Sequence, residues 1–144
     1  MNRIEARSAP SKFVSEPHLS MAIDGVPLDQ ALGAEAEGLV SALLGWFHDP
    51  ADCEVPWERI LPEAGCTGYA PLLICPDDLD LKCNVVIVEV VAEEEVIRWN
   101  KLGFDMTPLG AVGAIVRWDP GWGPYTFRRD EYEACLSAFR AATA

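Results

Sequence analysis

The aspartates between the two most apolar runs of the chain have the spacing that comes nearest to a metal site. Asp77, Asp78 and Asp80 lie between an apolar run at 72–75 and a second one at 83–91. Clustered carboxylates offer the hard oxygen ligands that calcium prefers. An EF-hand loop that begins at Asp78 would need an acid or amide at position 82 and a glycine at position 83, where this chain has Lys82 and Cys83. The pattern therefore favours a solvated acidic turn, and no metal is expected.

The two histidines and five cysteines are the remaining candidates for metal binding or nucleophilic catalysis. Structural zinc sites present their ligands in close pairs such as CxxC, and this sequence has no such pair. The nearest approach to a cluster is His48 with Asp49, Asp52 and Cys53. A small metal-dependent or thiol enzyme that uses His48, Cys53 and the Asp77 to Asp80 loop is therefore kept as an alternative. Buried free thiols are expected at three positions in apolar patterns, Cys75, Cys83 and Cys135.

Two tryptophans near the C-terminal end, Trp118 and Trp122, are candidates for contacts with a partner. The segment 119–124 combines proline and glycine, and loops of this kind rarely bury a tryptophan completely. Exposed tryptophans are enriched at interface hot spots. The competing interpretation is that Trp118 ends a core strand and that Trp122 folds back onto it. Neither GxGxxG nor GxxxxGK[ST] is present, so no nucleotide or other cofactor is expected.

The formal net charge of −12 is the strongest signal in the composition. Neutralising phosphate groups requires clusters of lysine and arginine, so this charge argues against nucleic acid and anionic membranes as direct partners. It favours a basic protein partner. Residues 77–95 contain seven acidic residues and one basic residue. Six of these acids are predicted to bind the partner, together with the two tryptophans: Asp77, Asp78, Asp80, Glu93, Glu94 and Glu95.

The sequence shows no pattern of a membrane span or a secretory signal. Its apolar runs reach about nine residues, whereas a membrane-spanning helix needs roughly 20. Arg3 and Arg7 near the N-terminus are not followed by an apolar stretch of the kind found in signal peptides. These features predict a cytoplasmic protein.

Hydrophobic periodicity predicts the elements that position these residues. The runs Cys83–Val91 and Val96–Leu102 are expected to form an antiparallel hairpin, with Ile97, Trp99 and Lys101 on one face of the second strand. A C-terminal helix is predicted because four apolar residues recur at helical spacing: Tyr132, Cys135, Leu136 and Phe139. The predicted fold class is α+β, a mainly antiparallel sheet with flanking helices that include this C-terminal helix.

The remaining segments are assigned from residue types that typically begin or end strands and helices. Residues 1–16 mix Arg, Ser, Pro and Lys without a period and are predicted to be a poorly ordered lead-in, followed by one α+β domain at 17–144. Leu19–Ile23 and the Asp24-Gly25 dipeptide predict a strand and a turn. Leu39–Phe47 is interpreted as a strand, with a buried helix turn as the alternative, because periodicity does not distinguish the two at this length. Two helix caps are expected at Asp29 and Asp49, and Pro56 is expected to break or kink the helix after Pro50.

Four stretches carry a resemblance to a group of known proteins. They are WERILP (57–62), PLLICPDDLDLKCNVVIVEV (71–90), IRWNKLG (97–103) and FRRDEYEACLSAF (127–139). Together they resemble the small acidic bacterial immunity proteins that accompany toxins of polymorphic or contact-dependent secretion systems. The resemblance implies a cytoplasmic binder that occludes a toxin domain and has no catalysis of its own. A homodimeric structural or interaction protein is a third hypothesis.

Overall fold

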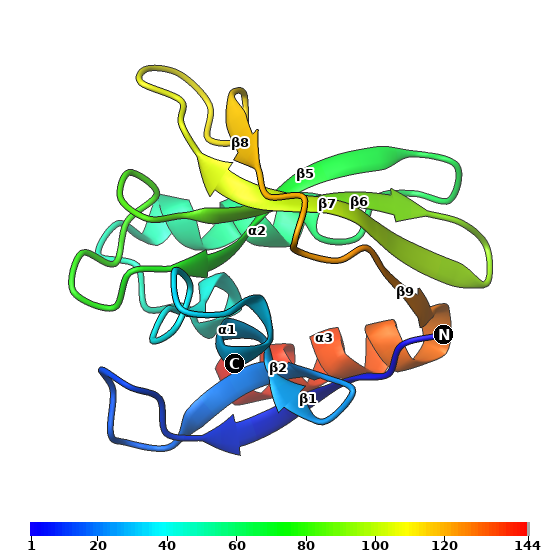
Figure 1. Ribbon diagram of the computed structural model, residues 1–144, viewed down its shortest axis with the longest axis horizontal. Coiled ribbons are helices and arrows are strands. Elements are labelled where there is room, and N and C mark those ends of the chain that lie inside the picture. Colours follow the sequence, from blue (N-terminus) through cyan, green and yellow to red (C-terminus); the bar gives the residue numbers. More distant parts are fainter. Residues whose placement is uncertain (144) are drawn as a thin grey trace.

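A computed structural model describes residues 1–143. These residues form an α+β fold of two sheets and three α-helices, which confirms the predicted fold class. The larger sheet has the strand order β4-β5-β6-β7-β8, and the smaller one has the order β1-β2-β3. All pairs of strands are antiparallel (Figure 1). The strands are β1 (Ile4–Ala9), β2 (His18–Ile23), β3 (Val26–Pro27), β4 (Val40–Ser41), β5 (Thr67–Ile74), β6 (Val86–Ala92), β7 (Val96–Asp105), β8 (Val116–Trp118) and β9 (Tyr125–Arg128).

Strand β6 is the centre of the larger sheet, and its β-branched run is covered on both faces. Val88 and Val90 lie in one apolar cluster, whereas Ile87 lies in a second cluster on the opposite face, and none of the three is exposed. Strands β6 and β7 form the predicted hairpin. The prediction that Lys101 shares a face with Ile97 is wrong. The pairing shifts by one residue opposite Glu89 and Val90, so that Lys101 is exposed.

Strands β8 and β9 both pair with the outer edge of β7. Strand β9 pairs with Val96–Trp99, and β8 pairs with Gly103–Asp105 near the other end of β7. Gly103 permits this approach, because a Cβ atom there would lie 2.2 Å from the carbonyl oxygen of Arg117. The segments before and after β8 are therefore both held at this edge of the larger sheet.

The N-terminal segment is part of the fold, so the prediction of a poorly ordered lead-in is wrong for residues 4–9. Strand β1 pairs with β2 along its whole length, from Ile4 opposite Ile23 to Ala9 opposite His18. Ile4 is only 3% exposed. A short strand with one buried face and polar residues on the other has little hydrophobic signal, so its order depends on pairing and on the helix that covers it. The predicted strand at Leu19–Ile23 and its turn at Asp24 are confirmed.

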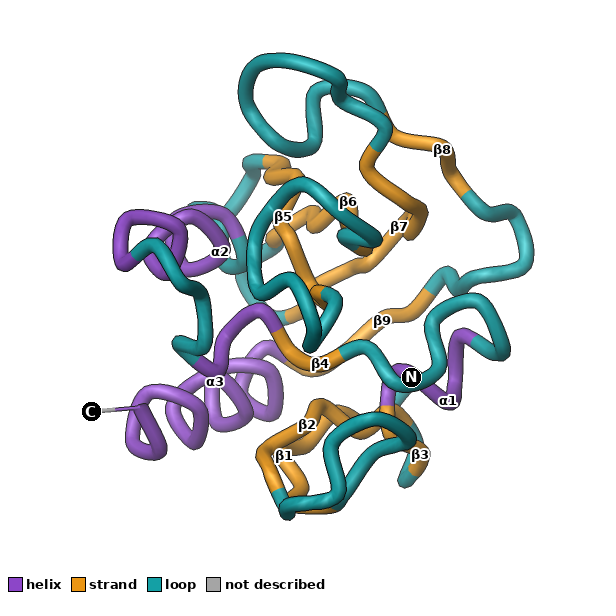
Figure 2. Tube along the Cα trace, turned by 90° about the vertical axis from the view of Figure 1, so that its left-hand side faces the viewer, coloured by secondary structure: helices purple, strands orange, loops and turns teal. Residues whose placement is uncertain are grey.

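Helix α3 (Arg129–Thr143) is the predicted C-terminal helix, and its four predicted apolar residues are all buried. Helix α3 packs against β1 and β9. Figures 1 and 2 show that α3 and the smaller sheet lie side by side, on the same side of the larger sheet. The hydroxyl of Tyr132 donates to the carbonyl oxygen of Ile60 at 2.7 Å and accepts from Nε1 of Trp99 at 3.2 Å. This one side chain therefore joins α3, β7 and the end of helix α2 (Glu54–Arg59), which Ile60 caps.

Helix α2 (Glu54–Arg59) contains Pro56 without a break, which corrects the prediction. Pro56 is the third residue of the helix, where a backbone N–H has no intrahelical acceptor, so the missing donor removes no hydrogen bond. The cap predicted at Asp49 is confirmed, because its carboxylate accepts from the backbone N–H of Ala51 at the start of the 3₁₀ helix η2 (Pro50–Cys53).

Two other local assignments differ from the prediction. Asp29 lies inside helix α1 (Leu28–Leu32), and its carboxylate accepts from the backbone N–H of Gly38 at 2.9 Å instead of capping the helix. The apolar run 39–47 is a strand only at β4, after which a 3₁₀ helix at Ala42–Leu44 ends at Gly45. Gly45 has a φ of 76°, a conformation that ends the strand-like path and that glycine adopts without strain.

Candidate functional site

The six predicted partner-binding acids do not form one surface. The loop that carries Asp77, Asp78 and Asp80 precedes β6, whereas the turn that carries Glu93, Glu94 and Glu95 follows it. The two groups therefore lie at opposite ends of β6, as Figure 1 shows. Each group has its own surroundings, which differ in charge.

The acidic residues before β6 are joined by Asp49, which caps η2, and by Asp52 within it. The backbone N–H of His48 donates to the carbonyl oxygen of Leu79 at 3.2 Å, which holds the start of η2 against the loop. Partial burial and then the carboxylates of Asp49 and Asp80 raise the pKa of Asp52. We call this five-residue group the acidic end: Asp49, Asp52, Asp77, Asp78 and Asp80.

The loop of the acidic end is held by its own side chains. The carboxylate of Asp80 accepts from the backbone N–H of Lys82 at 2.9 Å. A hydrogen bond with Asp78 raises the pKa of the Cys83 thiol, and Cys83 is exposed. The prediction of a buried thiol at Cys83 is thus wrong, because the chain turns outward before β6 begins. Cys135 is buried as predicted, and burial raises its pKa to about 12.

The turn after β6 is less anionic than its sequence indicates. Glu93 forms an ion pair with Arg98 at 3.0 Å, and its carbonyl oxygen accepts from Arg129 at 2.6 Å. A groove of about 600 Å³ at this turn is lined by Glu94 and Glu95 together with Arg128 and Arg129. Arg128 and Arg129 pair with Asp130 and Glu133, which also line this groove, so the charge here is mixed, whereas the acidic end has five carboxylates and one lysine.

The acidic end borders a groove of about 670 Å³. One side of the groove is formed by Asp52 and Val55, from η2 and α2, and by Leu81 and Lys82 of the loop before β6. The other side is formed by residues 107–112 of the segment between β7 and β8. This groove brings together segments that are far apart in the sequence, and no local pattern could have indicated it.

The two candidate tryptophans have different environments. Trp122 is 7% exposed and packs against Phe104, with ring centroids 5.2 Å apart, so little of its side chain is open to a partner. It folds back onto the core because the turn at 119–124 returns the chain to β7. Trp118 is half-buried on the edge strand, near Tyr69 and under the ammonium group of Lys101.

Trp118 belongs to a row of partly or fully exposed side chains that crosses strands β5, β6, β7 and β8. The hydroxyl of Tyr69 donates to Glu89 at 3.1 Å, and this bond raises the pKa of Tyr69. Lys101 lies 3.9 Å from the same carboxylate and 5.6 Å from the Trp118 ring. The polar groups of this row thus satisfy one another.

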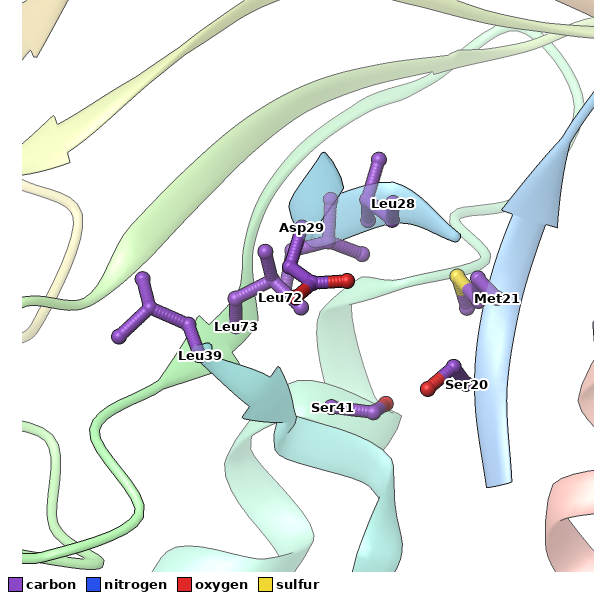
Figure 3. A pocket seen from close by; sticks show the side chains of 8 residues that line it. All are labelled: Ser20, Met21, Leu28, Asp29, Leu39, Ser41, Leu72 and Leu73. Carbon is purple, nitrogen blue, oxygen red and sulfur yellow. The ribbon is translucent and has the colours of Figure 1, made fainter. Parts of the chain in front are cut away.

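The structure also contains a small internal cavity of about 10 Å³ between the two sheets. Figure 3 shows the carboxylate of Asp29 and the hydroxyls of Ser20 and Ser41 around it, with Leu72 and Leu73 among its apolar neighbours. This volume is that of about one water molecule. The cavity is too small for a substrate or an organic cofactor.

The residues of the enzyme alternative lie in and beside the acidic end. His48 is exposed, and Cys53 packs at the edge of the second apolar cluster. Within residues 1–143, no three His, Cys, Asp or Glu side chains are grouped so that they could hold a metal ion. None of the helices described is long and apolar enough to cross a membrane.

Comparison of the chain with family models, with curated proteins and with solved structures gives no match. The functional interpretation therefore depends on the charge and shape of the surfaces described above.

Proposed function

We propose that this protein is a non-catalytic cytoplasmic binding protein that neutralises a basic protein partner, such as the toxin domain for which a small acidic immunity protein is made. The observation that carries this proposal is the acidic end. Its five carboxylates come from η2 and from the loop before β6, and Lys82 is the one basic residue in these two segments. A concentrated negative potential of this kind attracts a basic surface.

The magnitudes of electrostatic effects indicate that these acids speed up association with a partner more than they strengthen the final complex. Charges arranged in this way raise association rates by ~10 to 1000-fold at low salt. Exposed ion pairs add little to the affinity itself, about 0–1 kcal/mol each. The acidic end therefore supplies speed and selectivity, and apolar contacts elsewhere have to supply the affinity.

The main alternative, a metal-dependent or thiol enzyme, would use the same end of the molecule, because His48 lies just before η2 and Cys53 is its last residue. Metal analysis of the purified protein distinguishes the two. Stoichiometric zinc or calcium would favour the enzyme, and its absence after refolding in zinc and calcium would favour the binding protein.

The proposal is tested by expressing the product of each gene adjacent to this one, alone and together with this protein. We expect one neighbouring product to be toxic alone, to have a basic isoelectric point and to form a stable complex that restores growth. Size-exclusion chromatography of the co-expressed pair measures the complex. Absence of any complex, or a bound partner that is itself acidic, would contradict the proposal.

A further inference from the structure

The segment between β7 and β8 presents large apolar side chains to solvent. Leu109 is 90% exposed, Ile115 is 56% exposed and Met106 is 54% exposed. In Figure 1 this segment projects away from the larger sheet, beyond the end of β7. Several large apolar side chains exposed on one loop are a mark of an interaction surface.

Side-chain hydrogen bonds hold the backbone of this segment, which we call the apolar loop (residues 106–115). Oδ1 of Asp105 accepts from Oγ1 of Thr107 at 2.7 Å and from the backbone N–H of Gly113 at 3.0 Å. The Thr107 hydroxyl in turn accepts from the backbone N–H of Ile115 at 2.9 Å. The backbone N–H of Met106 donates to the carbonyl oxygen of Ile115 at 2.7 Å. The loop is thus closed at its base while Leu109 stays outside.

The apolar loop is also attached to the body of the protein. The guanidinium of Arg59, at the end of α2, donates to the carbonyl oxygen of Val112 at 2.6 Å. Val112 packs against the second apolar cluster of the core. A loop fixed in this way loses little conformational entropy when a partner binds, which increases the affinity obtained from each contact.

The groove beside the apolar loop combines two kinds of surface. Pro108 and Leu109 line one side, and Val55 and Leu81 add apolar surface. The charged lining is mixed, with Asp52 and Asp105 against Arg59 and Lys82, and Arg59 is already bonded to the loop. Asp52 lies beside Asp49 and Asp80 of the acidic end, so a partner that fits this border of the groove carries a large apolar side chain next to lysine or arginine.

We propose that the groove receives a segment of the basic protein partner, with an apolar side chain of that segment against Leu109 and a basic side chain facing Asp52. This inference rests on the proposed function and names the part of the surface that supplies affinity. A second copy of the chain is disfavoured as the occupant, because each copy carries a net charge of −12 and the groove itself is bordered by acids.

The experiment selects peptides from a random library displayed on phage against the immobilised protein. We expect the enriched peptides to combine lysine or arginine with large apolar residues. Their affinity should fall at least about tenfold in Leu109→Ser, because one apolar hot-spot contact is worth that much. Val26→Ser is the matched control, since Val26 is 43% exposed on β3, a strand of the smaller sheet. Peptide-induced shifts of backbone amide signals should fall on the apolar loop and on Asp52.

The role of the closed loop is tested by Thr107→Val, which keeps the exposed side chains and removes the hydroxyl. We expect weaker peptide binding, whereas unchanged affinity would show that the closed loop adds nothing. Circular dichroism verifies that each variant is folded.

Other outcomes separate the inference from the proposed function. No enrichment, or peptides that bind Leu109→Ser as tightly as the wild type, would overturn the inference. Basic peptides that lose affinity only when Asp52 and Asp78 are changed to lysine would overturn it and leave the proposed function standing. Peptides without basic residues would count against the proposed function and the charge half of the inference together.

Discussion

Replacing Tyr132 by phenylalanine should destabilise the protein strongly, although only one oxygen atom is removed. Tyr132 is fully buried, and its hydroxyl is the partner of both the Ile60 carbonyl and Nε1 of Trp99. Phenylalanine would leave both buried groups without a hydrogen bond. A buried polar group left unpaired costs about 1–3 kcal/mol, so for the two groups we expect a loss of about 2–6 kcal/mol in the free energy of unfolding.

This loss is measured by urea denaturation with tryptophan fluorescence as the signal. Tyr125→Phe is the matched control, because Tyr125 is half-buried and its hydroxyl makes no hydrogen bond within residues 1–143. We expect the control to stay within about 0.5 kcal/mol of the wild type. A Tyr132→Phe variant that also stays within this range would refute the claim that this hydroxyl joins α3, β7 and α2.

Three further substitutions test other parts of the fold. Ile4→Ala should lower the free energy of unfolding by about 2–4 kcal/mol, since Ile4 is 3% exposed. An unchanged denaturation midpoint would instead support a poorly ordered N-terminal segment. Gly103→Ala should cost about 1–3 kcal/mol, because its Cβ would meet the Arg117 carbonyl at 2.2 Å; a stable variant would show that β8 lies further from β7. Hydrogen bonds from the Arg3 backbone and from Asn2 lower the pKa of Asp24, so its contribution to stability is present above the usual pKa and lost as the pH falls through the lowered one. Asp24→Asn should thus flatten the acid side of a pH titration of stability, and an unchanged acid side would contradict this.

The elements that the sequence predicts correctly are those with a strong local pattern. The hairpin of β6 and β7 follows from two apolar runs separated by a few polar residues. Helix α3 follows from the spacing of Tyr132, Cys135, Leu136 and Phe139. In both cases the residues that decide the structure are neighbours in the chain, so hydrophobic periodicity is sufficient.

The features that the sequence does not predict depend on contacts between distant segments. Strand β1 is ordered by its pairing with β2 and by helix α3, which is more than a hundred residues away. Asp52 joins Asp80 only because η2 packs beside the loop before β6. The shift in strand pairing that exposes Lys101 cannot be recognised from the alternation of apolar and polar residues in β7.

The most direct test of the central claim is the salt dependence of association with the toxic neighbouring gene product. The association rate is measured by stopped-flow fluorescence between about 10 and 100 mM salt, over which the Debye length falls from roughly 30 to 10 Å. We expect the wild-type rate to fall steeply with salt, and Asp52→Lys/Asp78→Lys to be slower and less sensitive. The control Glu94→Lys/Glu95→Lys has the same net charge and should stay close to the wild type. Equal rates for the two variants, or a wild-type rate that does not change with salt, would contradict the account.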